Sequence, residues 1–187
     1  MTGETSAERP PYLPGDRPPQ DEIERMIRVD HAGEYGAVRI YGGQLAVVRH
    51  GRSRDEIRRM AEQEARHLAT FNELVRSHRV RPTLLQPLWH VAGYALGFAT
   101  ALLGEEAAMA CTVAVEEVID EHYRGQAERL GDDDPALKHT ILAFRDDELA
   151  HRDRAIERGA RDTLGYDLIS GAIKAGSRLA IWLSTRI

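Results

Sequence analysis

Two copies of a Glu-x-x-His motif are the residues of this chain best suited to chemistry. Each motif follows a single glutamate by about thirty residues, which gives six candidates: Glu34, Glu64, His67, Glu116, Glu148 and His151. On a helix, a three-residue spacing puts the carboxylate and the imidazole on one face. Four carboxylates with two imidazoles suit iron or manganese, since structural zinc prefers four-coordinate sites that usually contain thiolate. The spacing therefore predicts a two-metal carboxylate centre.

Helical phase separates these residues from the other acidic side chains. The six residues lie on four predicted helices. Each of these helices has an apolar stripe at steps of three and four, and each stripe carries one central glutamate. Glu117 falls on a polar face of its helix, so the phase selects Glu116 as the inward carboxylate. We expect Glu64 and Glu148 to bridge the two metals, while Glu34 and Glu116 bind terminally.

The charge of these stripes also favours metal ions. Each ionised carboxylate in a core costs several kcal/mol unless it is compensated, and four would consume a typical domain's stability of about 5 to 15 kcal/mol. No lysine or arginine lies on the four stripes. Two divalent cations would balance four carboxylates and leave both imidazoles neutral. The alternative is that the six residues form buried salt bridges or lie on solvated faces.

The elements that must position this centre are helical almost throughout from Asp21 onward. Apolar residues recur at steps of three and four, without strand-like alternation. Ser53 with Glu56 predicts a capping box, and Asp134 before Pro135 predicts an N-cap. The expected helices cover about 21–50, 53–79, 104–130 and 135–158, with an apolar segment at 83–103 and a C-terminal helix from about 166.

This order of elements predicts an all-α, ferritin-like four-helix bundle with an additional apolar crossover helix and a C-terminal amphipathic helix. Short links make two antiparallel hairpins, and the apolar segment crosses between them. Glu116 and Glu148 lie at one level of their hairpin. Glu34 and Glu64 lie at different distances from the loop that joins their helices, and the difference is about one helical turn. Helix tilt or the length of the side chain must absorb this difference.

Five further residues near the inward stripes are candidates for supporting roles. Asp30 and Asp147 are candidates to hold the free N–H groups of the two histidines, with plain surface or capping roles as the alternative. His122 and Tyr123 lie two turns beyond the inward glutamate of their helix and are candidate catalytic residues for proton or electron delivery. Tyr41 also faces inward, and we assign it to core packing because aromatic side chains at helical spacing usually pack.

The segment 82–104 is unusually apolar for a helical bundle, because it contains no Asp, Glu, Lys or Arg. Gly93, Gly97 and Ala101 lie four apart and predict a face that lets helices approach closely. The length is near that of a transmembrane span, but a proline, two glycines and the lack of basic anchors disfavour spanning. We expect a helix in the plane of a membrane surface or packed on the bundle, and buried core is the alternative.

The C-terminal helix carries a basic stripe opposite an apolar face, a pattern typical of membrane interfaces. The alternative is that its arginines hold the phosphates of a nucleotide reductant, with Arg25, Arg178 and Arg186 as the cofactor-binding residues. No Gly-rich Rossmann loop is present to do so.

Composition bounds the remaining possibilities. The 187 residues, 42% of them hydrophobic, suit one domain, which we expect at 21–187. A net charge of -5 with interspersed signs argues against nucleic acid as a partner. A single cysteine, Cys111, excludes an intramolecular disulfide. Residues 1–20 hold five of the eight prolines and few apolar residues, so we expect a flexible tail, and they lack the features of an export or transit peptide.

Seven stretches of the sequence carry a family resemblance. They are RVDHAGEYGA at 28–37, EARH at 64–67, FNEL at 71–74, RVRPT at 79–83, TALLG at 100–104, AMACTVAVEE at 108–117 and FRDDELAH at 144–151. Together they resemble the demethoxyubiquinone hydroxylase family, and the resemblance extends from about Asp21 to the C-terminus. Several of these motifs are specific to that family rather than to di-iron proteins in general.

The resemblance implies a peripheral membrane di-iron monooxygenase of ubiquinone biosynthesis. Such an enzyme hydroxylates the ring of a demethoxyubiquinol with an isoprenoid tail, using dioxygen and two electrons. The resemblance also implies the six residues named above as the ligands of two iron ions, NADH as electron donor, and a lipid-binding partner protein of the same pathway.

Location and assembly are less determined by the sequence. Without a transit peptide, we expect the cytoplasmic face of a bacterial inner membrane, or the matrix side of the mitochondrial inner membrane if the source is eukaryotic. The sequence leaves open whether the chain forms a homo-oligomer. Two other functions remain as alternatives: a ferritin-like protein of iron oxidation and storage, and a di-iron oxidase of another lipid.

Overall fold

The computed structural model describes residues 19–187, and within this range it is helical and contains no strand. The elements are α1 Pro19–Val47, α2 Gly51–Ser77, α3 Gln86–Leu102, α4 Glu105–Leu130, α5 Pro135–Glu157, the short 3-10 helix Ala160–Asp162 and α6 Tyr166–Ser184. The all-α prediction is confirmed. The predicted tail at 1–20 lies outside the described residues, except that residues 19 and 20 belong to α1.

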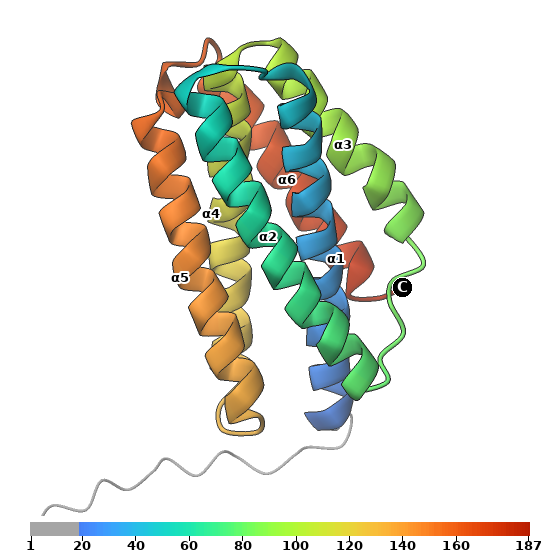
Figure 1. Ribbon diagram of the computed structural model, residues 1–187. Helices are drawn as coiled ribbons and strands as arrows, with labels where there is room; N and C mark the ends of the chain where they lie inside the picture. The colour runs from blue at the N-terminus through green and yellow to red at the C-terminus, as the bar shows by residue number, and fades with distance from the viewer. Residues whose placement is uncertain (1–18) are drawn as a thin grey trace, which may run out of the picture.

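The helices form a ferritin-like bundle. Helices α1 and α2 make one antiparallel hairpin, α4 and α5 make the other, and α3 crosses between the two hairpins (Figure 1). The crossover α3 packs mainly on α1, and α6 packs mainly on α4. The two additional helices therefore lie outside the bundle, against the helices that carry the single glutamates.

The first hairpin brings its two glutamates to one level without any special tilt. Glu34 lies 13 residues before Val47, the last residue of α1, and Glu64 lies 13 residues after Gly51, the first residue of α2. The predicted mismatch of one turn came from extending the first helix to residue 50. The helix in fact ends three residues earlier, which removes the mismatch.

The start of α2 differs from the prediction. The capping box at Ser53 is wrong, because the helix begins at Gly51 and Ser53 is buried inside it. His50 is the N-cap residue and makes no side-chain cap bond. Glu56 instead pairs with arginines, among them Arg158. The cap of α5 follows the prediction, since the carboxylate of Asp134 accepts a hydrogen bond from the backbone N–H of Leu137 at 2.9 Å.

Glycines let α3 lie directly on α1. A Cβ atom on Gly97 would come within 1.9 Å of the carbonyl oxygen of Ile40, and one on Gly43 within 2.2 Å of the carbonyl oxygen of Tyr94. Neither position can hold a larger side chain without separating the two backbones. The predicted close-approach face is confirmed. Among the described residues, no helix has both the length and the apolar character needed to cross a membrane.

The apolar core of the described residues has three clusters: a small one around Cys111 and Ile173, between α4 and α6, and two larger ones, one toward each end of the bundle. One larger cluster includes Ile57, Met60 and Met109, and the other includes Ile27 and Ile141. The predicted metal ligands occupy the level between them, which means that apolar packing at both ends isolates this polar layer from solvent.

Candidate metal centre

Six buried side chains from four helices converge in the middle of the bundle. They form two overlapping groups, each with ligand atoms that lie within 4.8 Å of one another: Glu34, Glu64, His67 and Glu148, and then Glu64, Glu116, Glu148 and His151. Each of the six is at most 3% exposed. Glu64 and Glu148 belong to both groups, and the other four residues belong to one group each. The six side chains therefore form two groups that could each hold a metal ion, with two carboxylates in common.

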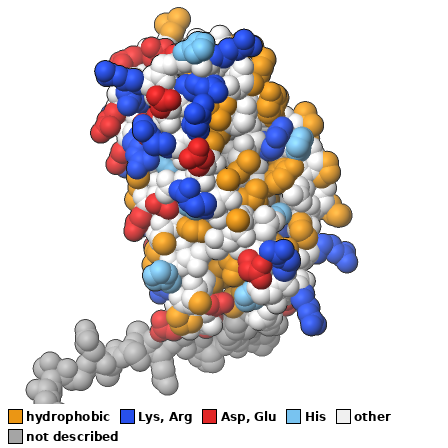
Figure 2. All heavy atoms as spheres, viewed as in Figure 1, with side chains coloured by type: hydrophobic (Ala, Val, Ile, Leu, Met, Phe, Trp, Pro, Cys, Tyr) orange, Lys and Arg blue, Asp and Glu red, His pale blue; other side chains and the backbone are white. Residues whose placement is uncertain are grey.

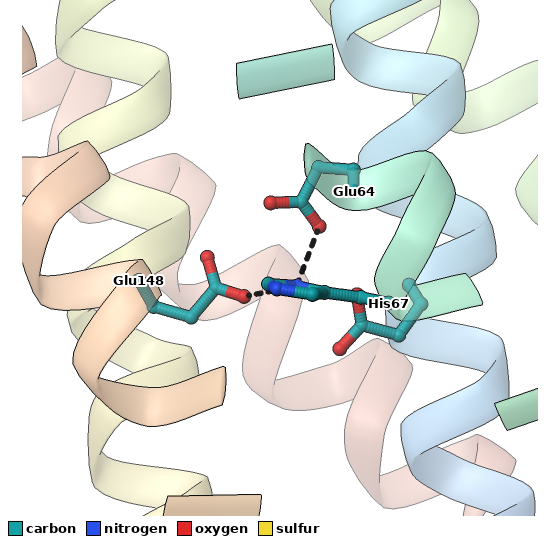
Figure 3. Close-up of side chains that lie close together, drawn as sticks. Glu64, His67 and Glu148 are labelled. Carbon is teal, nitrogen blue, oxygen red and sulfur yellow. Dashed lines mark ion pairs between the residues drawn. The ribbon is translucent and has the colours of Figure 1, made fainter. Parts of the chain in front are cut away.

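Both imidazoles turn Nδ1 toward the carboxylates. In His67, Nδ1 lies 3.2 Å from Glu148 Oε1 and 3.5 Å from Glu34 Oε2. In His151, Nδ1 lies 3.1 Å from Glu64 Oε1 and 3.1 Å from Glu148 Oε2. Figure 3 shows Glu64 and His67 of α2 facing Glu148 of α5 across the bundle.

The outer nitrogen of each imidazole has its own partner. His67 Nε2 lies 3.1 Å from Asp147 Oδ2, as predicted. His151 Nε2 lies 3.2 Å from the side-chain oxygen of Gln63. Sequence reasoning missed Gln63, although one signal was available: Gln63 directly precedes the Glu of the first motif, as Asp147 directly precedes the Glu of the second.

The prediction that Asp30 holds a ligand histidine is wrong. Asp30 Oδ1 instead hydrogen-bonds His122 Nε2 at 2.9 Å and accepts from the amide of Gln126 at 2.7 Å. Both partners lie on α4, whereas the ligand histidines lie on α2 and α5. The His122 side chain is 13% exposed. These three residues make a polar connection from the surface toward the buried layer.

Two tyrosines hold the single glutamates. The hydroxyl of Tyr41 donates to Glu116 Oε1 at 2.8 Å, and the hydroxyl of Tyr123 donates to Glu34 Oε1. Each tyrosine lies seven residues after the glutamate of its own helix and binds the glutamate of the other helix. The assignment of Tyr41 to packing alone was therefore incomplete. The shared seven-residue offset is the signal that could have revealed its role.

Glu117 lies off the site, as its helical phase predicts. Glu117 forms an ion pair with Lys174 of α6, outside the cluster. Arg178 of α6 pairs with Glu121 of α4 at 3.0 Å. These contacts join α6 to α4 across their polar edges.

Only two of the three arginines predicted to bind a nucleotide lie at the same place on the surface. Arg25 and Arg186, from opposite ends of the chain, line one polar surface depression together with Arg28 and the acidic Asp21 and Glu24. The guanidinium of Arg186 also lies 4.1 Å from the ring centre of Trp182. Arg178 does not line this depression.

Burial and mutual repulsion dominate the electrostatics of the cluster. Burial, with the neighbouring carboxylates, raises the pKa of Glu64 and Glu116 well above the ordinary value. Burial likewise raises the pKa of Glu148 to about 7. Burial lowers the pKa of His67, but the nearby carboxylates of Glu148 and Glu34 outweigh it and raise that pKa to about 10. Within residues 19–187 no lysine or arginine is buried to compensate.

The cluster fits two divalent cations. Glu34 Oε2, Glu64 Oε1 and His67 Nδ1 are buried and have no hydrogen-bond partner among the described residues. A buried polar atom without a partner is costly, and coordination of a cation would satisfy these three atoms. Carboxylate oxygens with imidazole nitrogens are the donor set that suits iron or manganese. The six predicted residues therefore lie together in groups that could hold metal ions.

Comparison with known proteins finds similarity over nearly the whole chain. Residues 21–184 match the family described as ubiquinone biosynthesis protein COQ7. A relative from Rhodospirillum rubrum named 3-demethoxyubiquinol 3-hydroxylase is 59% identical over 94% of this chain and 83% of its own length. A human relative named NADPH-dependent 3-demethoxyubiquinone 3-hydroxylase, mitochondrial, is 51% identical over 88% of this chain and 78% of its own. The chain therefore belongs to the COQ7 family of ubiquinone biosynthesis proteins.

Proposed function

We propose that this protein is a di-iron monooxygenase that hydroxylates the ring of a demethoxyubiquinol in ubiquinone biosynthesis. The observation that carries the proposal is the buried layer of four glutamates and two histidines in a chain of the COQ7 family. Two bound iron ions would supply dioxygen activation with two electrons, so that one oxygen atom enters the ring and the other leaves as water.

The chain's own residues hold the reacting centre in a rigid geometry. Glu34 and His67 would hold one iron, Glu116 and His151 the other, and Glu64 and Glu148 both, which completes the set of six ligands. The two tyrosine hydroxyls fix the terminal carboxylates by hydrogen bonds. Apolar packing above and below excludes bulk water from the layer. His122 and Asp30 are assigned to proton transfer between the surface and the centre, because their hydrogen bond leads inward from a partly exposed imidazole.

An apolar groove supports an isoprenoid substrate. The groove has a volume of about 530 Å³ and lies between α1, α3, α4 and α6. Its lining includes Gly33 and Val115, which directly precede the proposed ligands Glu34 and Glu116 in the chain. Glycines and alanines line much of the remainder, so a long apolar chain fits along the groove. We assign this groove to the substrate's tail and the end nearest the two glutamates to its ring.

Exposed hydrophobic side chains support contact with a lipid surface. An apolar edge is formed by residues around α3 and α6: Leu84, Leu88, Val91, Phe98, Leu102, Leu103, Leu164, Leu168, Leu179 and Trp182. Figure 2 shows hydrophobic side chains gathered over the α3 side, while charges of both signs cover the α2 and α5 side. We propose peripheral membrane attachment through this edge, and the same edge is our candidate contact for a lipid-binding partner protein.

The test of attachment is co-sedimentation with vesicles of mixed zwitterionic and anionic lipids. Replacing Leu88 and Val91 with glutamate should abolish co-sedimentation. The control replaces Arg58 and Glu62, on the exposed face of α2, with alanine and should retain it. Equal binding of both variants would remove the apolar edge from the proposal.

A reduced nicotinamide nucleotide is the proposed electron donor. Arg25 and Arg186 are assigned to its phosphates, because both line the same polar depression. Either NADH or NADPH fits this assignment, since both present phosphates that guanidinium groups bind well. Arg178 is left out of the assignment because it pairs with Glu121.

Complementation of a bacterial strain that lacks its own demethoxyubiquinol hydroxylase tests the function. The wild-type chain should convert the accumulated demethoxyubiquinone into ubiquinone precursors downstream of it, as measured by mass spectrometry of lipid extracts. Glu116→Gln should block conversion and reduce the iron content of the purified protein. The matched control is Glu117→Gln, which changes the neighbouring carboxylate outside the cluster and should preserve both.

Two results would contradict the proposal. Conversion by the Glu116→Gln protein would exclude the assigned centre, and failure of the wild-type chain despite iron loading would exclude the substrate. An iron-storage role is not favoured, because the relatives are named as hydroxylases and the groove serves no purpose in storage.

A further inference from the structure

The two halves of the candidate metal centre differ in what holds their histidines from outside. In each Glu-x-x-His motif, the residue directly before the glutamate contacts the imidazole of the other motif. Asp147 Oδ2 lies 3.1 Å from His67 Nε2, and Gln63 Oε1 lies 3.2 Å from His151 Nε2. The inner layer is nearly symmetric, but one imidazole faces a carboxylate and the other faces a neutral amide.

The orientation of the Gln63 amide is determined by its two neighbours. Its oxygen lies 3.2 Å from His151 Nε2. Against the effect of partial burial, the Gln63 amide also lowers the pKa of the Asp147 carboxyl, so its NH2 group faces that carboxylate while its oxygen accepts from His151. The polar side chains therefore follow the order His67, Asp147, Gln63, His151 outside the cluster. At Nε2, the nitrogen that faces away from the cluster, only His67 donates directly to an anion.

We propose that Asp147 and Gln63 make the two metal positions inequivalent, so that the position of Glu34 and His67 binds a divalent cation more tightly than the position of Glu116 and His151. This inference rests on the metal centre proposed above.

The physical reason is the charge of the outer acceptor. A hydrogen bond from an imidazole to a carboxylate is about twice as strong as one to a neutral acceptor, and it makes the other nitrogen a more basic metal ligand. Loss of such an outer partner typically costs about 10-fold to 100-fold in metal affinity. The Asp147 side chain is 41% exposed, so solvent screens part of its charge and we expect the lower end of this range.

The other features of the two positions do not reverse this difference. Each terminal glutamate accepts one hydrogen bond from a tyrosine, and each histidine presents Nδ1 to the same two shared carboxylates. Burial lowers the pKa of His151, and of the charges outside the cluster Arg154 lowers it more than Asp147 raises it. The two positions are therefore alike in their shared ligands, and the outer charges do not favour the His151 position.

Half-site variants test the inference by separating the two positions. Glu116→Gln leaves the ligands of the His67 position complete, and Glu34→Gln leaves those of the His151 position complete. Each removes a carboxylate from a crowded anionic layer, which favours folding of the apoprotein, and circular dichroism with thermal unfolding verifies this. The probe is Mn²⁺, and the unbound ion is measured by electron paramagnetic resonance. We expect Glu116→Gln to bind Mn²⁺ about 10-fold more tightly than Glu34→Gln.

Changes to the outer residues then identify the cause. Adding Asp147→Asn to Glu116→Gln should weaken Mn²⁺ binding about 10-fold, while adding it to Glu34→Gln should change binding by less than about 2-fold. Adding Gln63→Glu to Glu34→Gln should strengthen binding. A merely structural role for Asp147 would weaken both half-sites equally.

Equal Mn²⁺ affinities of the two half-site variants, or an equal effect of Asp147→Asn on both, would overturn the inference while leaving the two-metal centre intact. Failure of the wild-type protein to bind Mn²⁺ at all would overturn the centre itself, and the inference with it.

Discussion

The carboxyl group of Glu148 makes a sharp prediction about the metal-free protein. Its side chain is 2% exposed, and burial among other carboxylates raises its pKa from the ordinary 4.5 to about 7. In the folded apoprotein Glu148 therefore keeps a proton that the unfolded chain has already released. Replacing Glu148 with glutamine keeps the shape of the protonated group and removes its titration.

The sign and size of this effect of pH on the unfolding free energy follow from proton linkage. Because the folded state binds the extra proton, this contribution to stability is complete below about pH 4.5 and is lost as the pH rises toward about 7. Each pH unit inside that window costs about 1.4 kcal/mol. Between about pH 5 and about pH 6.5, the wild-type apoprotein should lose about 2 kcal/mol relative to Glu148→Gln. His67 stays protonated in both folded and unfolded states below about pH 6.5, so it adds little to the comparison.

Urea unfolding of chelator-treated protein, followed by circular dichroism at several pH values, measures this difference. Glu148 also acts on the pKa of Glu64, Glu116 and His67, so the difference between the two unfolding free energies reports Glu148 together with its effect on these neighbours. Glu157→Gln, an exposed change in the same helix, should follow the wild-type curve. Binding of a divalent cation should reverse the trend, because the metal binds the ionised carboxylate and its affinity rises with pH. The reasoning would be refuted if the unfolding free energy of the wild type, minus that of Glu148→Gln, stayed constant or increased as the pH rises.

Three further predictions address other parts of the molecule. Gly97→Ala should destabilise the protein by about 1 to 3 kcal/mol in urea unfolding, because its Cβ would overlap the backbone of α1. The control Gly171→Ala, in open space on α6, should instead stabilise the protein by about 0.5 to 1 kcal/mol. Tyr41→Phe should lower the thermal stability of the metal-loaded protein by about 1.5 to 3 kcal/mol, since a hydrogen bond to a buried carboxylate is lost, and an unchanged stability would exclude that bond. Arg186→Ala should raise KM for the nicotinamide nucleotide about 10-fold, and an equal effect of Arg178→Ala would contradict the assignment of phosphates to the depression.

Local periodicity was enough to identify the six cluster residues. A carboxylate and an imidazole three residues apart share a helix face in any helix, so their inward direction follows from the apolar stripe on which they lie. The same argument separated Glu116 from Glu117, which the structure finds paired with Lys174 outside the cluster. The close-approach face around Gly97 was also readable, because a glycine repeat has few other uses in an apolar helix.

Contacts between helices could not be read in this way. Asp30 lies on the inward stripe of its helix, and Asp147 and Gln63 lie one step from the stripes of theirs. Which of the three meets a histidine of the cluster depends on the rotation and height of the facing helix. The same is true of Tyr41, whose hydroxyl reaches a glutamate on α4.

The apolar groove is likewise a property of the assembled fold, since it exists only where α3 and α6 flank the pair α1 and α4. Helix phase is set within a few turns of the chain, whereas partners across a bundle are set by the packing of every helix at once.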